Sequence, residues 1–205
     1  GGVETIQIVD SLNPIPGPGE VCVRVHNAGV NFAELMMRQG LYGSSPKFPF
    51  TPGYEASGEI ISLGEGVESF KEGDRVLAMT GFGGWAEQVV LDESRVFLLP
   101  DEVSFEQAAA IPVTYGTAFH MLVYLGNLAK EDTVLIHHAA GGVGTAVSQI
   151  CDAYGVSLVV GTASSPKKDF VESMGMRFVD RDSEDFVEVC KDMTDGKGVH
   201  HAIDP

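Results

Sequence analysis

Residues 138–144, with the sequence HAAGGVG, have the small side chains of a loop that binds phosphate groups. They follow the apolar stretch 133–137, which predicts a buried strand, and they precede a helical pattern that extends to about residue 154. In the G-x-G-x-x-G arrangement of dinucleotide-binding proteins, the second and third glycines correspond to Gly141 and Gly144, with Ala139 at the first position. Such glycines let the backbone approach a pyrophosphate and let the helix pack close to the sheet. A glycine-rich turn without a ligand is the alternative interpretation.

The residues after the next predicted strand, 157–161, indicate which dinucleotide the loop would take. An NAD site typically places Asp or Glu about 20 residues after the glycines, where the carboxylate bonds the ribose hydroxyls. No acid precedes Asp169 in this region, and four side chains could donate to a 2′-phosphate: Ser164, Ser165, Lys167 and Lys168. Lysines at a helix start are unfavourable unless an anion is bound, so the sequence predicts NADPH. The alternative is that these lysines are solvated surface. The candidate cofactor-binding residues are Ala140, Gly141, Gly142, Val143, Gly144, Gly161, Thr162, Ser164 and Lys168.

Two patterns of secondary structure surround these residues. The first hundred or so residues predict short strands at 21–25, 59–63, 76–79, 85–91 and 96–99, separated by Gly and Pro turns, which is typical of a compact barrel-like fold. A helical run from 105 to about 122 follows, bent or split at Pro112. Strands and helices then alternate to residue 204, which predicts a parallel sheet with right-handed crossovers. The fold class is therefore α/β, a β-rich domain followed by a doubly wound sheet, and we expect this sheet to be incomplete because such sheets usually have about six strands.

Composition narrows the classes of function. The net charge of −16 argues against a nucleic-acid binder, which needs cationic groups to neutralise phosphates. The three cysteines are far apart and form no C-x-x-C pair, which fits a reducing compartment and excludes a clustered cysteine zinc site. No apolar run approaches the roughly 20 residues needed to span a bilayer, and no signal peptide is visible. These features predict a cytoplasmic protein.

Several further segments resemble the medium-chain dehydrogenase/reductase superfamily. They are AGVNFAELMMRQGLY at residues 28–42, TPGYE at 51–55, GDRV at 73–76, EQAAA at 106–110 and the glycine loop itself. Within the superfamily, the chain is most similar to the zinc-less quinone oxidoreductases, and among those to the vesicle amine transport protein group. The resemblance implies a GroES-like substrate domain at 1–120, a partial Rossmann domain at 121–205, and a homodimer when the protein is full length.

The resemblance also implies that the chain holds no zinc. Zinc-dependent relatives carry Cys and His ligands where this sequence has Asn31 and Tyr54, neither of which is a normal zinc ligand. Four histidines in two adjacent pairs are the remaining candidates for a metal ligand: His137, His138, His200 and His201. Because neighbouring side chains on a strand point to opposite faces, we expect no metal site from either pair.

A reductase without metal needs side chains that polarise the substrate carbonyl. The resemblance places Asn31 and Tyr42 in the substrate pocket, where an amide and a phenol can donate to a quinone or enone oxygen; a helix cap and loop packing are their alternative roles. It also places Thr114 near the nicotinamide, with helix packing as the alternative. Glu34 replaces the Asp common in its motif, and its longer arm favours a structural hydrogen bond. Phe48, Phe50 and Phe82 could form an apolar wall or simply pack the loops.

The sequence therefore predicts an NADPH-dependent, zinc-independent reductase of quinones or α,β-unsaturated carbonyls. An enoyl reductase acting on fatty-acid thioesters is another member of the same superfamily. The alternative from a different class is a vesicle or membrane-trafficking protein, peripherally associated with membranes, that keeps the nucleotide site with little catalysis.

Overall fold

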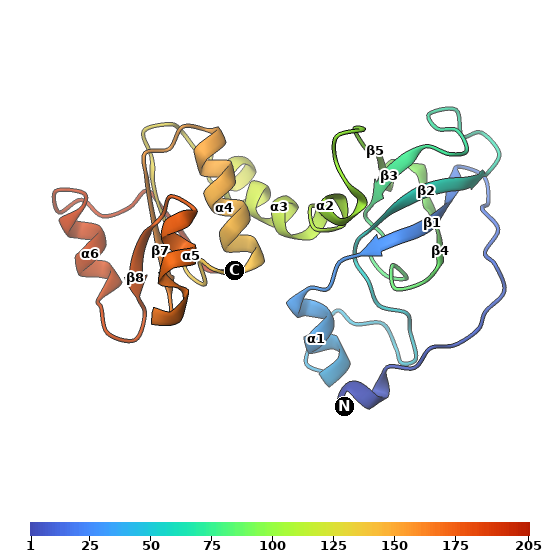
Figure 1. The fold of residues 1–205 in the computed structure, drawn as a ribbon, viewed down its shortest axis with the longest axis horizontal. Helices are drawn as coiled ribbons and strands as arrows, with labels where there is room; N and C mark the ends of the chain where they lie inside the picture. The colour runs from blue at the N-terminus through green and yellow to red at the C-terminus, as the bar shows by residue number, and fades with distance from the viewer. The chain divides into compact units, whose positions relative to one another are not determined.

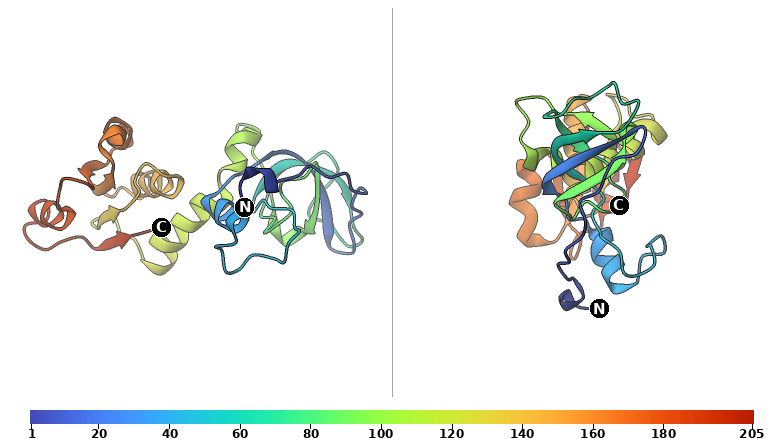
Figure 2. Two further views of the ribbon diagram at one scale, coloured as in Figure 1. Left: turned by 90° about the horizontal axis from the view of Figure 1, so that it is seen from below. Right: turned by 90° about the vertical axis from the view of Figure 1, so that its right-hand side faces the viewer.

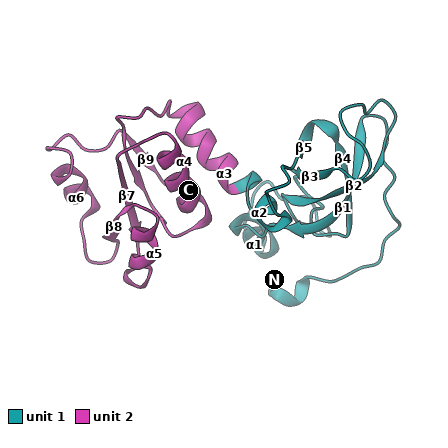
Figure 3. Cartoon of the chain, turned by 45° about the horizontal axis from the view of Figure 1, so that its top comes forward, with its two compact units in different colours: residues 1–113 teal, residues 114–205 magenta.

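The structure, a computed structural model, describes residues 1–205. Contacts within the chain divide it into two compact units, residues 1–113 and 114–205, coloured separately in Figure 3. The boundary expected from the sequence, between residues 120 and 121, lies slightly later along the chain and stays a prediction. Each unit has its own sheet and its own core.

Unit 1 is built on an antiparallel five-stranded sheet in the order β4-β1-β2-β3-β5. Its strands are β1 (Glu20–Ala28), β2 (Ala56–Leu63), β3 (Arg75–Ala78), β4 (Gln88–Asp92) and β5 (Val96–Leu98). The alternation of Val21 and Val23 with polar residues follows the two-residue period of a strand, and both side chains are buried in a core with Ile60 and Val76. The predicted β-rich domain is confirmed, although β4 begins three residues after Trp85.

Unit 1 also contains a helix that the strand pattern did not predict, α1 (Phe32–Gln39). Asn31 is its N-cap, and Gly40 ends it in the left-handed conformation with φ of 74°, which glycine adopts without strain. Before β1, the chain from residue 6 to 19 enters no helix or strand (Figures 1 and 2).

The expected helical run after residue 104 forms in three pieces. It comprises α2 (Phe105–Ala109), α3 (Pro112–Phe119) and a π-helical stretch, η3 (His120–Leu125). Ser104 and Gln107 make a capping box at the start of α2. The predicted split at Pro112 is confirmed, because proline lacks the N–H that would continue α2.

Unit 2 is a parallel four-stranded sheet in the order β8-β7-β6-β9. The strands are β6 (Thr133–Ile136), β7 (Leu158–Ala163), β8 (Arg177–Asp180) and β9 (His201–Ile203), connected by the helices α4 (Gly142–Ala153), α5 (Lys168–Ser173) and α6 (Phe186–Asp192), with a 3-10 turn, η4 (Ser165–Lys167), before α5. Helices cover both faces, because α4 and α5 pack with Val134 and Ile136 while α6 packs with Leu135. The predicted doubly wound parallel sheet is confirmed (Figure 1).

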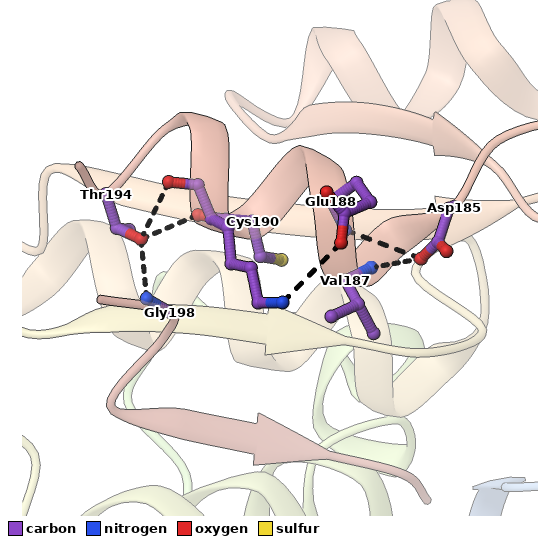
Figure 4. A network of polar contacts seen from close by, with 7 residues as sticks. Asp185, Val187, Glu188, Cys190, Thr194 and Gly198 are labelled. Carbon is purple, nitrogen blue, oxygen red and sulfur yellow. Dashed lines mark hydrogen bonds and ion pairs between the residues drawn. The ribbon is translucent and has the colours of Figure 1, made fainter. Parts of the chain in front are cut away.

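Polar side chains hold the ends of α6 (Figure 4). The Asp185 carboxylate accepts hydrogen bonds from the backbone N–H groups of Val187 and Glu188 at the helix start. At the other end, the Thr194 hydroxyl donates to the Cys190 carbonyl and accepts from the Gly198 N–H at 2.7 Å. These bonds fix the turn that leads into β9.

All three cysteines, Cys22, Cys151 and Cys190, are buried free thiols. Burial raises the pKa of each, to about 11 for Cys151. None of the helices has both the length and the hydropathy of a membrane span.

Candidate functional site

The glycine loop of unit 2 leaves the start of α4 open to an anion. Gly141 is the N-cap residue and offers no side chain to the helix, so the N–H groups of the first turn have no side-chain partner. The positive end of the helix dipole lies at the same place. Gly141 and Gly142 are exposed, and a Cβ at Gly141 would have only the His138 carbonyl oxygen nearby, at 3.1 Å. These features suit the phosphates of a dinucleotide.

The other glycines of the site are required by close packing. A Cβ on Gly144 would lie 2.4 Å from the Ala139 carbonyl oxygen, so only glycine lets α4 approach the loop this closely. A Cβ on Gly161, in β7, would lie 2.7 Å from the Ala139 side chain. At Gly142 the would-be Cβ comes 2.8 Å from Thr114 Cγ2, so Thr114 lies beside the glycine loop, while its expected place near the nicotinamide stays a prediction.

Hydrogen bonds from β7 fix the turn that enters the loop. The Ala139 N–H donates to the Thr162 carbonyl at 3.0 Å, and His137 Nδ1 lies 2.9 Å from the Thr162 hydroxyl. His138 adopts a left-handed conformation with φ of 53°, which is uncommon for a residue with a side chain, and its carbonyl accepts from the Gly141 N–H. Thr162 is buried, so its bonds with His137 and Ala139 stabilise the turn from the interior of unit 2.

The predicted 2′-phosphate donors follow the end of β7. Ser164 precedes the 3-10 turn η4, and Lys168, half exposed, forms an ion pair with Glu172 at 3.9 Å. The structure adds an acid that sequence spacing missed. Asp180, at the end of the neighbouring strand β8, accepts a hydrogen bond from the Ser165 hydroxyl at 2.5 Å, which lowers the pKa of this carboxyl group. Only the parallel register that pairs Ala163 with Asp180 brings this carboxylate near.

In unit 1, Asn31 lies between two buried glutamates. Its Nδ2 donates to Glu55 Oε1 at 2.8 Å, and its backbone N–H donates to Glu34 Oε2 at 2.8 Å. Burial raises the pKa of Glu55, an effect that hydrogen bonds from the Val113 N–H and Asn31 partly oppose. Glu34 makes the structural hydrogen bond that its longer arm suggested, and Asn31 fills the alternative role of a helix cap.

Tyr42, the other predicted catalytic residue, has Tyr54 as a neighbour, a residue for which the sequence predicted no role at the site. Burial, followed by the hydrogen bond with Tyr42, raises the pKa of Tyr54 to about 12. The Tyr54 ring lies 5.3 Å from that of Phe82, and Phe82 contacts Phe50 edge-on at 5.7 Å. Phe48 extends this row of rings. A row of aromatic faces beside two phenolic hydroxyls can bind a flat molecule that carries oxygen.

The histidine pairs differ in part from expectation. His137 and His138 do diverge, since His138 is exposed and lies 3.8 Å from Asp204. His200 and His201, however, both approach Asp132, at 4.0 and 2.8 Å, so the expectation of opposite directions was wrong for this pair. The reason is that His200 precedes β9, where strand alternation does not apply. No group of three or more His, Cys, Asp or Glu side chains is arranged to hold a metal ion.

Comparison with known proteins connects both units to one superfamily. The alcohol dehydrogenase GroES-like domain family matches residues 17–101, and the zinc-binding dehydrogenase family matches residues 142–205. The synaptic vesicle membrane protein VAT-1 homolog of Rattus norvegicus is 41% identical over the whole chain, which spans 51% of that protein. The chain thus spans about half the length of the curated relatives it matches.

Solved structures agree with this assignment. The human synaptic vesicle membrane protein VAT-1 homolog-like protein matches 97% of the chain and 63% of its own at 38% identity, with a TM-score of 0.91. The Escherichia coli quinone oxidoreductase complexed with NADPH matches 97% of the chain and 61% of its own at 32% identity, with a TM-score of 0.89. The chain therefore belongs to the medium-chain dehydrogenase/reductase superfamily, in its quinone oxidoreductase-like branch.

Proposed function

We propose that the full-length protein is an NADPH-dependent, zinc-independent reductase that transfers hydride to quinones or α,β-unsaturated carbonyls. The observation that carries the proposal is the uncapped first turn of α4 behind Gly141, next to a loop that only small residues can form. The relative from Escherichia coli was solved with NADPH, which supports the same cofactor for this chain.

The residues at the end of β7 favour NADPH through their charge. Lys167 and Lys168 would face a 2′-phosphate as cations, and Ser164 would donate a hydrogen bond. Asp180 opposes this preference, but its carboxylate is engaged by the Ser165 hydroxyl. The balance therefore depends on the lysines.

In unit 1, Asn31 and Tyr42 would donate hydrogen bonds to the carbonyl oxygen of the substrate as that oxygen gains negative charge. The bound cofactor would supply the hydride. Reduction of a quinone consumes this hydride and one proton, which solvent provides, and yields a hydroquinone and NADP⁺. Neither Asn31 nor Tyr54 has the chemistry of a zinc ligand, which supports charge stabilisation by hydrogen bonds alone.

Two measurements on the full-length protein test this proposal. NADPH should be oxidised when a quinone or an enone is added, and no turnover across a broad panel would contradict a reductase. Lys168→Ala should weaken NADPH about five-fold and NADH little, because an exposed charge contributes about 1 kcal/mol. Lys191→Ala is the matched control, since Lys191 is equally exposed and pairs with Glu188 at 3.5 Å on α6. Equal losses for both cofactors would show that Lys168 does not contact the 2′-phosphate.

The second candidate function is a role in vesicle or membrane trafficking with the nucleotide site kept for binding. The names of the VAT-1 relatives motivate it. Co-sedimentation of the full-length protein with liposomes, with and without NADPH, separates the two. Membrane binding that depends on NADPH, without turnover, would favour the trafficking role.

A further inference from the structure

Two buried carboxylates hold one partly buried amide in unit 1. Glu34 and Glu55 are 3% and 2% exposed, and both accept hydrogen bonds from Asn31, one from its backbone and one from its side chain. Burying a carboxylate is costly unless its oxygens are paired. Both buried carboxylates are placed around a single residue, which indicates that the orientation of the Asn31 side chain matters.

Glu55 is surrounded by contacts that leave its carboxylate little freedom. Oε1 accepts from Asn31 Nδ2 and Oε2 accepts from the Val113 N–H, both at 2.8 Å. Gly29 gives the carboxylate its room, because a Cβ there would lie 2.1 Å from Oε1. The side chain is thus fixed at both oxygens.

The hydrogen-bonding groups of the Asn31 side chain can be counted. Its oxygen faces the backbone N–H of Glu34 in the capping box of α1. Its Nδ2 carries two hydrogens, and one of them is held by Glu55. The second Nδ2 hydrogen is therefore the donor that remains for a ligand. Without Glu55 only the bond at the amide oxygen would remain, and Nδ2 would lose the partner that directs its second hydrogen.

We propose that Glu55 is a positioning residue, whose buried carboxylate orients the Asn31 amide so that its second N–H points toward the substrate oxygen. This inference rests on the proposed reductase function. It assigns Glu55 no contact with substrate. Its effect on the reaction passes through Asn31 alone.

A purely structural role for Glu55 makes a different prediction. The bond from the Val113 N–H satisfies the start of α3, and its loss would lower stability whatever residue occupies position 31. Positioning instead predicts that Glu55 matters to catalysis only while Asn31 is present. A double-mutant cycle distinguishes these cases, because residues that act as one unit are not additive.

The experiment uses the full-length protein with a quinone that the wild type reduces. The variants are Asn31→Ala, Glu55→Gln and the double variant, each measured for kcat/KM, NADPH affinity and thermal unfolding. The two N–H donors meet opposite oxygens of the carboxylate, and glutamine would place its NH2 group at one of them, so it cannot keep both bonds. Glu59→Gln, a partly exposed position in β2, the strand that directly follows Glu55, is the matched control. If Glu55→Gln does not fold, Glu55→Asp, which keeps the charge and shortens the arm, replaces it.

We expect each single variant to lose about ten- to a hundred-fold in kcat/KM, mostly in kcat, with NADPH affinity unchanged. The double variant should fall no more than about two-fold below Asn31→Ala. Losses that multiply, or a Glu55→Gln enzyme with the kcat/KM of the wild type, would overturn the inference while leaving the reductase proposal intact. A wild type that reduces no substrate would overturn the reductase proposal, and the inference with it.

Discussion

Replacing Gly144 by alanine tests how closely α4 must pack against the glycine loop. The added Cβ would lie 2.4 Å from the Ala139 carbonyl oxygen and 2.7 Å from its Cα, so helix and loop must move apart by about 1 Å. Both partners are backbone atoms, which cannot rotate away as a side chain can. Overpacking of this kind costs about 1–3 kcal/mol or more. For a chain of this size, such a cost lowers the Tm by roughly 2–12 °C.

The same displacement should weaken the cofactor, because the N–H groups that would bind the pyrophosphate lie in the helix turn that moves. We expect NADPH affinity to fall at least about ten-fold, measured by fluorescence titration of the full-length protein alongside its Tm. Gly116→Ala in α3 is the matched control, since no atom lies within 4 Å of its would-be Cβ. Alanine in a helix is favoured over glycine by about 0.5–1 kcal/mol, so that Tm should rise slightly. A Gly144→Ala protein with the Tm and affinity of the wild type would refute the packing argument.

Two further predictions concern titrating groups. Tyr54 should ionise near pH 12, so Tyr54→Phe should remove the component near pH 12 from a tyrosinate absorbance titration. Because folding raises this pKa, the stabilising contribution of Tyr54 is present below the ordinary value of about 10 and is lost as the pH rises toward 12. The hydrogen bond from His201 lowers the pKa of Asp132, so Asp132→Asn should be less stable than the wild type at neutral pH. In urea unfolding, the free energies of unfolding of the two proteins should converge as the pH falls through the lowered pKa, below about 3.9. A difference in stability that persists in acid would contradict the ionic contribution.

Periodicity was sufficient to predict most strands and helices of both units. The loop was predictable because Gly141 and Gly144 lie between a strand and a helix, which is a local signal. The helix α1 was not among the predicted elements, although its residues, Phe32–Gln39, are good helix formers between Asn31 and Gly40, because the segment was interpreted through its family motif and a helix cap at Asn31 was only the alternative. Its start at Asn31 shows that a capping residue can also contact a buried glutamate.

The contacts that could not be predicted join residues far apart in the sequence. Asp180 reaches Ser165 through the register of β7 and β8, and Tyr54 meets Phe82 through folded loops. Glu55 joins Asn31 to Val113 across more than eighty residues of chain. Such contacts follow from how strands and loops assemble, and no local pattern of residue types specifies them.

The three buried thiols have a practical consequence for labelling. A thiolate is the form that reacts with maleimides and iodoacetamides, and burial disfavours it at Cys22, Cys151 and Cys190. The native chain should therefore give little background modification. One new cysteine at an exposed position, such as Ser44 in unit 1 or Glu172 in unit 2, would then carry a dye or spin label selectively while every native residue of the glycine loop stays in place.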